Sequence, residues 1–362
     1  MTAYCLIVDG DTGHADSLSA LARDAGFDSQ CLHSLAAARE VLAQQPVDVL
    51  FLALDLPGGE DGLELLRSRW LSATDIVVMG DRDEPPRADE AVRRGAAYFC
   101  CKPIDEQYIS TLLADIAQEC GAAAEAECAQ QSTVCTLDQF GFLRGSSRSM
   151  RKLYRQLRKV AETEASLLVV GESGTGKELV ARTVHHLSSR SEGPLIAFNC
   201  AAVAENLMES ELFGHEKGSF SGAERRHRGF FEQADGGTLV LDEITEMDFE
   251  LQAKLLRVLE TRMLRRVGAE TEFKLDVRVI SATNRSPEEA VAQGQLREDL
   301  YYRLAQFPVY LPPLRERGAD IAGLAQIFLN ELNARHETEL CFSEEGLEHV
   351  RTYGWPGNVR QL

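Results

Sequence analysis

Two kinds of segment alternate along residues 3–120. Short apolar runs with many β-branched or aromatic residues stand at 4–8, 47–54, 75–80 and 97–103, and each is followed by a stretch with helical spacing of apolar residues. Such alternation is typical of a parallel sheet with helices on both faces. The sequence therefore predicts an α/β domain with a five-stranded, doubly wound parallel sheet over 1–120.

The pattern changes beyond this first domain. Residues 121–139 are rich in Ala, Gln and Glu without an apolar period, which suits a linker or an extension of the preceding helix. A second α/β domain is predicted over 140–311, where an apolar strand at 166–171 runs into a glycine-rich turn. Residues 312–362 follow a helical pattern, and the chain stops without a capping pattern, so we expect an incomplete helical subdomain.

Composition narrows the classes of function. Of the 362 residues 44% are hydrophobic, which is enough for packed cores. The net charge is −19, so the chain as a whole does not have the excess of basic residues that is typical of nucleic-acid-binding proteins. The nine cysteines have no CxxC spacing, which indicates reduced thiols rather than a metal or disulfide framework. No signal peptide or membrane-spanning run is found, so we predict a cytoplasmic protein with no membrane contact.

The glycine-rich turn has the composition of a phosphate-binding loop. Its sequence is GESGTGKE, placed between a predicted strand and a predicted helix. Glycines let backbone N–H groups approach phosphate oxygens, and a lysine adds a positive charge for the β- and γ-phosphates. Glu178 stands where a Ser or Thr hydroxyl usually reaches Mg²⁺. The predicted ATP-binding residues here are Gly171, Glu172, Ser173, Gly174, Thr175, Gly176, Lys177 and Glu178.

A second acidic motif completes the predicted chemistry. The buried-strand pattern GGTLVLDEI at 236–244 ends in Asp242 and Glu243. Asp242 is predicted to hold Mg²⁺ through its water shell, and Glu243 to polarise the attacking water. Lys177, Asp242 and Glu243 together predict an ATPase with ATP and Mg²⁺ as cofactors.

Three stretches together resemble one family. FNCAAVAENLMESELFGHEKGSFSGA at 198–223, with GESGTGKE and the final WPGNVRQL, resembles the central AAA+ domain of bacterial sigma-54-dependent transcriptional activators over about 140–362. In that family a GAFTGA loop contacts sigma-54 and couples hydrolysis to promoter opening. The matching residues are Gly218, Ser219, Phe220, Ser221, Gly222 and Ala223, with serines in place of the usual Ala and Thr.

The resemblance implies roles for five more residues. Asn199 matches the switch residue that holds Glu243 away from water, and Asn284 matches sensor I, which reads the γ-phosphate. Arg360 matches sensor II. Arg297 and Arg303 match arginines that reach into a neighbouring subunit's site, which requires an oligomeric ring, expected to be a hexamer.

The first domain resembles response-regulator receivers, which have a flavodoxin-like fold. Asp9, Asp11 and Lys102 match parts of the phosphorylation site. The nucleophile position lies four residues before Pro57 and five after Asp48, and both counts lead to Ala53. Gly10 and Gly80 occupy the second acid position and the hydroxyl position. We therefore expect a pseudo-receiver that does not use phosphorylation, with Asp55 as the alternative acceptor if the loop is shifted in register.

The leading hypothesis is a sigma-54-dependent activator whose AAA+ ring remodels the sigma-54 RNA polymerase holoenzyme. We expect dimers through the N-terminal domain, and DNA contact only through a C-terminal domain that these 362 residues do not include. The alternative is an ATP-binding AAA+ scaffold that sequesters a protein partner. A small-molecule kinase is disfavoured, because nothing beyond the phosphate-binding loop is typical of a kinase lid.

Overall fold

The computed structural model describes residues 3–67, 74–81, 87, 90–91, 94, 96–129, 137–220 and 223–362. The chain divides into two compact units. One unit comprises Met1–Asp138, Gly145–Lys152 and Arg315–Tyr353, and the other comprises Gln139–Arg144, Leu153–Leu314 and Gly354–Leu362. The domain boundaries expected from sequence, at 120, 139 and 311, stay predictions.

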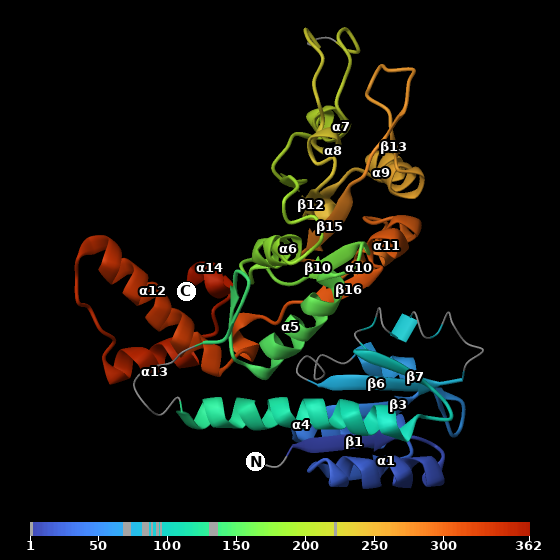
Figure 1. Ribbon diagram of the computed structural model, residues 1–362, viewed down its shortest axis with the longest axis vertical. Helices are drawn as coiled ribbons and strands as arrows, with labels where there is room; N and C mark the ends of the chain where they lie inside the picture. The colour runs from blue at the N-terminus through green and yellow to red at the C-terminus, as the bar shows by residue number, and fades with distance from the viewer. Residues whose placement is uncertain are drawn as a thin grey trace. The chain divides into compact units, whose positions relative to one another are not determined.

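The first unit contains a five-stranded parallel sheet in the order β2-β1-β3-β6-β7, which confirms the predicted doubly wound fold (Figure 1). All five residues of β3 are buried, because side chains on both faces of this central strand pack under helices. The strands are β1 (Tyr4–Val8), β2 (Asp28–Leu32), β3 (Val49–Ala53), β6 (Asp75–Gly80) and β7 (Tyr98–Cys101).

Capping residues fix where the helices of this domain begin. Asp11 accepts a hydrogen bond from the backbone N–H of His14 at the start of α1, and Ser34 accepts one from that of Ala37 at the start of α2. Helix α4 continues as far as Ala129, so the predicted extension of the preceding helix is correct for 121–129. The elements are α1 (Thr12–Asp24), α2 (Leu35–Gln44), the hairpin β4 (Asp55–Leu56) with β5 (Glu60–Asp61), the 3₁₀ helix η1 (Gly62–Arg67) and α4 (Glu106–Ala129).

The second unit is built on another five-stranded parallel sheet, in the order β11-β12-β15-β10-β16. Its core packs the faces of β12 and β15 against α8 and α9, with Phe231, Leu239, Leu241 and Leu255 almost fully buried. The strands are β10 (Leu167–Val170), β11 (Leu195–Asn199), β12 (Thr238–Asp242), β15 (Arg278–Thr283) and β16 (Phe307–Tyr310).

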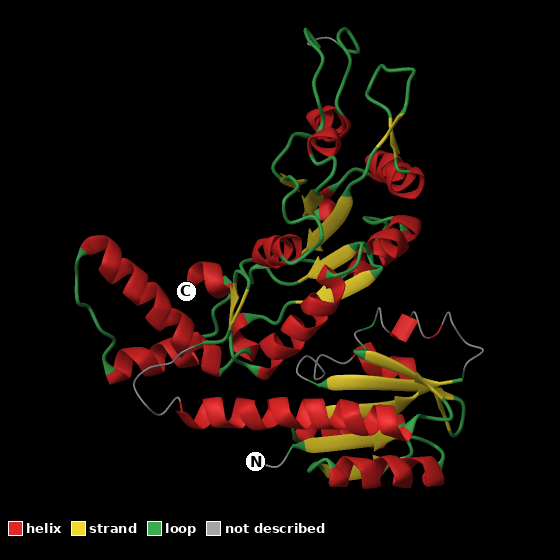
Figure 2. Cartoon of the chain, in the orientation of Figure 1, coloured by secondary structure: helices red, strands yellow, loops and turns green. Residues whose placement is uncertain are grey.

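Helices connect these strands, as expected for a parallel sheet (Figure 2). They are α6 (Lys177–His186), α7 (Glu205–Phe213), α8 (Phe230–Gln233), the 3₁₀ helix η3 (Ile244–Glu246), α9 (Phe249–Thr261), α10 (Pro287–Ala292) and α11 (Glu298–Leu304). Helix α5 (Arg148–Ala161) precedes the first of these strands, β10. Short hairpins join β8 (Gln139–Phe140) to β9 (Leu143–Arg144), and β13 (Met263–Leu264) to β14 (Phe273–Lys274).

The last part of the chain is helical, as the sequence predicts. It contains the 3₁₀ helix η4 (Leu314–Glu316) followed by α12 (Ala319–His336), α13 (Glu344–Thr352) and α14 (Asn358–Gln361). Among the described residues, no helix has both the length and the apolar character needed to cross a membrane.

Candidate functional site

The glycine-rich turn joins the end of β10 to the start of α6. Gly174 and Gly176 have φ values of 80° and 108°, in the region that favours glycine. A Cβ atom on Gly174 would lie 2.3 Å from the carbonyl oxygen of Gly357, so the close approach of the backbone also requires glycine. Thr175 stabilises the turn, since its hydroxyl donates to the carbonyl of Glu172 at 2.8 Å. The result is a fixed cradle of backbone N–H groups at a helix N-terminus.

Lys177 lies inside this cradle. Its Nζ donates to the carbonyl of Gly171 at 2.9 Å and lies 3.5 Å from Oε1 of Glu243. Its side chain is only 8% exposed, so its charge is held next to the loop rather than in solvent. Glu178, the next residue of α6, is exposed.

The two acids stand at the carboxyl end of β12. Glu243 has a φ of 52°, in the left-handed region, and its N–H donates to Oδ1 of Asp242 at 3.1 Å. The backbone N–H of Asn284, just after β15, donates to Oε2 of Glu243 at 3.1 Å. Parallel strands place their carboxyl ends along one edge, which brings the acids to the same end of the sheet as the glycine-rich turn.

The switch residue expected from the resemblance has a different partner. Asn199 ends β11 and lies opposite Asp242 in the strand register. Its Nδ2 donates to Oδ2 of Asp242 at 3.1 Å, whereas the predicted partner was Glu243. Asn284, the predicted sensor I residue, donates its backbone N–H to Glu243. The switch and sensor roles of these two residues stay predictions.

The end of the chain packs on the glycine-rich turn. The N–H of Arg360 donates to the carbonyl of Gly174 at 3.3 Å, and its Nη1 donates to Oγ of Ser173 at 3.4 Å. The predicted sensor II residue therefore lies beside the phosphate cradle.

Asn358 fixes this contact, and the sequence analysis did not single it out. It is fully buried, and its Nδ2 donates to the carbonyl of Ser173 at 3.0 Å and to Oε2 of Glu172 at 3.1 Å. Its Oδ1 accepts from the N–H of Leu314 at 2.8 Å. The available sequence indication was its place in WPGNVRQL, two residues before Arg360.

The glycine-rich turn, Lys177 and the carboxylate of Asp242 together suit a nucleotide bound with Mg²⁺. In the part of the chain that the structure describes, no group of three or more His, Cys, Asp or Glu side chains is arranged to hold a metal. Mg²⁺ usually binds through one or two carboxylates together with phosphates and water, so a single acid beside a phosphate cradle is a suitable arrangement. Asp242 would supply that carboxylate.

Comparison with known proteins decides the family. Residues 143–310 match the sigma-54 interaction domain, 315–362 the AAA+ ATPase lid domain and 5–114 the response regulator receiver domain. The regulatory protein AtoC of Escherichia coli is 38% identical over 360 residues, covering 99% of this chain and 78% of AtoC. This chain belongs to the sigma-54-dependent response-regulator activators.

Other relatives agree with this assignment. The transcriptional regulatory protein ZraR of Salmonella typhimurium is 40% identical over 362 residues, covering 99% of this chain and 80% of ZraR. The crystal structure of NtrX from Brucella abortus in complex with ATP is 32% identical, with a TM-score of 0.57, and covers 100% of this chain and 78% of that one. The sigma-54 activator is an ATPase of the AAA+ class that binds nucleotide and regulates sigma-54-dependent transcription.

The loop predicted to contact sigma-54 follows α7. The N–H of Gly218 donates to the carbonyl of Ala223 at 2.8 Å, which closes the loop at its base. Phe220 is 40% exposed, and its ring makes an edge contact with His215, with ring centroids 4.9 Å apart. Ser219 packs against Gly268 of the β13–β14 loop, where an added Cβ would lie 2.6 Å from the serine Cβ. Ser221 and Gly222 lie outside the described residues.

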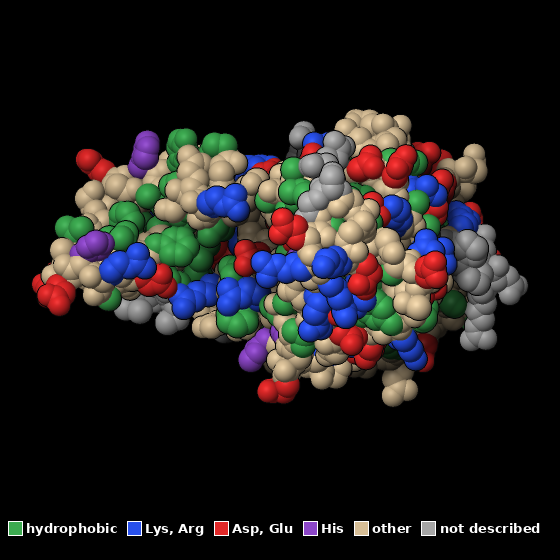
Figure 3. All heavy atoms as spheres, turned by 90° about the horizontal axis from the view of Figure 1, so that it is seen from above, with side chains coloured by type: hydrophobic (Ala, Val, Ile, Leu, Met, Phe, Trp, Pro, Cys, Tyr) green, Lys and Arg blue, Asp and Glu red, His purple; other side chains and the backbone are tan. Residues whose placement is uncertain are grey.

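Charged residues surround the base of this loop. Arg266 pairs with Glu216 at 2.8 Å and with Glu232 at 2.7 Å. The side chains of Arg226 and Arg228 are more than half exposed. Figure 3 shows basic, acidic and hydrophobic side chains interspersed on the face that it presents. The loop is therefore anchored by ion pairs while its aromatic side chain remains accessible.

The two predicted finger arginines have partners on their own chain. Arg297 makes a double contact with the carboxylate of Asp299, at 3.0 and 2.7 Å, and its guanidinium lies 5.3 Å from the ring centroid of Phe249. Nη2 of Arg303 donates to the carbonyl of Leu259, near the end of α9, at 2.7 Å. Their action in a neighbouring subunit stays a prediction.

The receiver site retains one ion pair. Asp9 is 1% exposed, and Nζ of Lys102 donates to its two carboxylate oxygens at 3.0 and 2.8 Å. Burial by itself would raise the pKa of Asp9, but hydrogen bonds from Lys102, from the N–H of Asp11 and from His14 bring that pKa below its usual value. Lys102 is thus neutralised within the domain.

Neighbouring side chains fill the other positions of the receiver site. Ala53 ends β3 and is 1% exposed. A Cβ atom on Gly10 would lie 2.6 Å from Cδ of Pro57. One on Gly80 would lie 2.7 Å from a methyl carbon of Leu54 and 3.0 Å from the ring of Phe99. The second acid and the hydroxyl therefore have no room unless these neighbours move.

The alternative acceptor, Asp55, has an arginine as its partner. Asp55 belongs to β4, which pairs with β5, and its side chain is 72% exposed. Its Oδ1 accepts from Arg87 at 2.8 Å. Its carboxylate is therefore engaged by an arginine at the surface, whereas Lys102 is engaged by Asp9.

Proposed function

We propose that this activator opens promoters by ATP-driven remodelling of the sigma-54 RNA polymerase holoenzyme. The observation that carries the proposal is the direct connection between the site and the loop: Asn199 bonds to Asp242, and the chain runs from Asn199 through α7 into the loop that presents Phe220. A change at the nucleotide therefore has a short path to the sigma-54 contact.

Each residue of the site has its own role in ATP hydrolysis. Lys177 and the backbone N–H groups of the glycine-rich turn bind the β- and γ-phosphates. Asp242 would hold Mg²⁺, which would neutralise phosphate charge. Glu243 accepts a proton from the attacking water, and Arg360 stabilises the phosphates from the lid side.

The proposal includes a ring of subunits, expected to be a hexamer. Arg297 and Arg303 supply positive charge to the neighbouring subunit's γ-phosphate in the transition state. In the described conformation both guanidinium groups contact their own chain, so assembly would require Arg303 to leave the carbonyl of Leu259.

Sigma-54 capture tests the proposed coupling. With ADP and aluminium fluoride as transition-state mimic, the chain should retain sigma-54, and Phe220→Ala should reduce that retention at least about tenfold because the aromatic contact at the loop is lost. Phe142→Ala is the matched control, since Phe142 is 43% exposed on the β8–β9 hairpin and should have no effect. Equal retention by the Phe220 and Phe142 variants would contradict the proposal, and ATP hydrolysis with no retention would favour the sequestering scaffold.

We further propose that the receiver-like domain transmits its input without phosphorylation. The supporting observations are the methyl group of Ala53 at the nucleophile position, the Asp9–Lys102 ion pair, and the side chains of Pro57 and Leu54 in the remaining space. Dimerisation, inhibition of the ATPase or partner binding are the outputs that such a domain can provide.

Acetyl phosphate tests the receiver directly. The full chain, incubated with acetyl phosphate and Mg²⁺, should gain no phosphoryl mass, and Ala53→Asp alone should also fail, because Gly10 and Gly80 supply neither the second acid nor the hydroxyl. Mass spectrometry of the intact protein measures both. A phosphorylated species in the native chain, and above all one on Asp55, would refute this part of the proposal.

A further inference from the structure

A cavity of about 90 Å³ lies at the C-terminal end of α9 in the second unit. A cavity of about 150 Å³ accommodates benzene, so this one suits a molecule of about three to five non-hydrogen atoms. Both apolar and polar side chains line it. The apolar residues are Phe231, Val258, Leu259, Leu275, Val277 and Val279, and the polar residues are Glu164, Ser166, Arg262, Arg278, Arg303 and Gln306.

Arg278 is the deepest cation in this wall. It is 2% exposed, and its Nη1 and Nη2 donate to the carbonyls of Ala161 at 3.1 Å and Val160 at 2.8 Å. Among the described residues its Nε has no hydrogen-bond partner. A buried donor without a partner is costly, so Arg278 places an uncompensated donor and a positive charge in the cavity wall.

Two further guanidinium groups border the same space. Nη2 of Arg303 donates to the carbonyl of Leu259, and the guanidinium group has further N–H donors. Arg262 follows α9 in the left-handed conformation with a φ of 54°, and its side chain is exposed. Three positive charges therefore meet at one small cavity.

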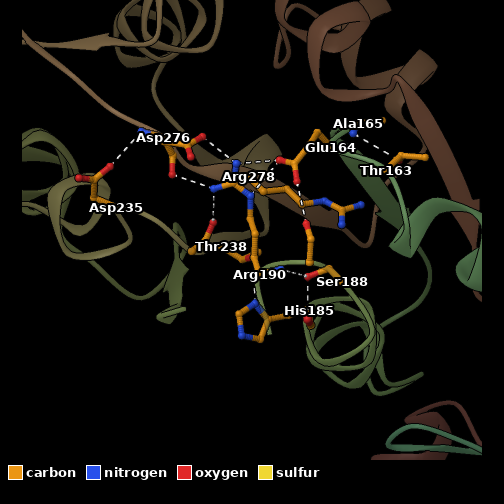
Figure 4. A network of polar contacts seen from close by, with 12 residues as sticks. Thr163, Glu164, Ala165, His185, Ser188, Arg190, Asp235, Thr238, Asp276 and Arg278 are labelled. Carbon is orange, nitrogen blue, oxygen red and sulfur yellow. Dashed lines mark hydrogen bonds and ion pairs between the residues drawn. The ribbon is translucent and has the colours of Figure 1, made fainter. Parts of the chain in front are cut away.

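The acid on this wall is already engaged. Figure 4 shows the carboxylate of Glu164 directed toward Arg190. Glu164 accepts from Nε of Arg190 at 2.8 Å and from Ser189 at 3.2 Å. The hydrogen bond from Arg190 lowers the pKa of Glu164, but Arg190 itself offsets the negative charge. The cavity consequently has an excess of positive charge.

We propose that this cavity binds a small aliphatic carboxylate of two or three carbons. The carboxylate would accept hydrogen bonds from Arg278 and Arg303 with Arg262 at the entrance, and the short chain would pack against Leu275 and Val277. Guanidinium forks match carboxylates in geometry and charge, and the apolar lining residues favour an organic anion over a fully polar one.

Occupancy of the cavity has a consequence for hydrolysis, which rests on the proposed function. A bound carboxylate holds Arg303 on its own chain, and that arginine is then withheld from the neighbouring subunit's site. Small carboxylates would therefore inhibit the assembled ATPase without competing with ATP.

Propionate tests the site, with propionamide as its neutral analogue. Ligand-detected NMR on the full chain should show saturable binding of propionate and none of propionamide at equal concentration. Inorganic phosphate should bind more weakly than propionate. Binding of propionamide as strong as that of propionate, or tighter binding of phosphate, would overturn the assignment of ligand class.

Substitutions of residues that line the cavity test where propionate binds. Arg262→Gln should weaken propionate binding about tenfold, as expected for loss of a charged hydrogen bond. Gln306→Glu should weaken propionate binding similarly, because it adds a negative charge. The N–H of Ser166 donates to Oε1 of Gln306 at 2.9 Å, and a glutamate can still accept this hydrogen bond. Arg265→Gln, which does not line the cavity, should bind normally. Unchanged propionate binding in both the Arg262 and the Gln306 variant would show that propionate does not bind in this cavity.

The ATPase supplies a separate readout. Propionate should slow hydrolysis by the assembled chain at saturating ATP, and Arg262→Gln should relieve this inhibition. Binding without inhibition would refute the link to Arg303 and leave the carboxylate site standing. Failure of sigma-54 capture would bear on the proposed function but not on propionate binding.

Discussion

Replacing Glu243 by Gln is expected to give a protein that binds ATP but hydrolyses it about a hundredfold to ten-thousandfold more slowly. Gln keeps the size of the side chain and can still accept from the N–H of Asn284, now at 3.1 Å. It cannot take a proton from water. The cradle around Lys177 should remain intact, because its contact with the carbonyl of Gly171 does not involve Glu243.

Phosphate release at saturating ATP measures the loss, and binding of a fluorescent ATP analogue measures the intact cradle. The matched control is Glu246→Gln, since Glu246 lies on the neighbouring η3 and pairs with Arg285 at 2.5 Å. Its turnover should stay close to that of the native chain. Normal turnover in the Glu243 variant would show that another group acts as the base.

Replacing Arg303 by Ala is expected to reduce hydrolysis by the assembled protein about a thousandfold or more, the range found for arginine fingers. ATP binding by a single subunit should change little, because the contacts recorded for Arg303 lie at α9 and the cavity beside it. The substitution also frees the carbonyl of Leu259. Because this lost hydrogen bond can lower stability, the thermal unfolding midpoint of the variant has to be measured to show that it is folded.

The control for this variant is Arg257→Ala, which removes an exposed arginine of α9 that pairs with Glu272 at 2.8 Å. Its turnover should be close to normal under conditions where sedimentation shows assembly. If Arg303→Ala hydrolyses ATP at the native rate in assembled protein, the finger assignment fails.

Local motifs made the nucleotide site predictable. The glycine-rich turn lies between β10 and α6 as the sequence indicated, and Asp242 ends the predicted strand β12. Each of these features depends on a few consecutive residues whose types are dictated by backbone geometry or by phosphate chemistry. Strand β2 was harder to recognise because DSQCL is mostly polar and, in the described sheet, none of its residues is fully buried.

Contacts between distant segments were not predictable in the same way. Asn358 meets Ser173 across 185 positions of the chain, and no periodic pattern records that pairing. The sequence also located Ala53, Gly10 and Gly80 without indicating that Pro57 and Leu54 occupy the space beside the glycines. Such packing depends on the folded backbone, because side chains fill whatever room neighbouring elements leave.

The partners of Asn199 and Arg303 illustrate a second limit. Family resemblance assigns each residue a role in one state of a working assembly. The described conformation pairs Asn199 with Asp242, and Arg303 with the carbonyl of Leu259. Side chains that act in a cycle have more than one set of contacts, and a residue pattern does not specify which set a given state holds.

The most direct test of the central claim, a motor whose active sites are completed between subunits, is hydrolysis by mixed assemblies. Arg303→Ala subunits retain the proposed base, Glu243, and Glu243→Gln subunits retain the proposed finger, Arg303. Neither variant should hydrolyse ATP alone, and mixing them should restore a measurable fraction of native phosphate release, with a maximum near equal proportions. Mixtures that stay as inactive as the separate variants, under conditions where sedimentation shows co-assembly, would contradict the claim.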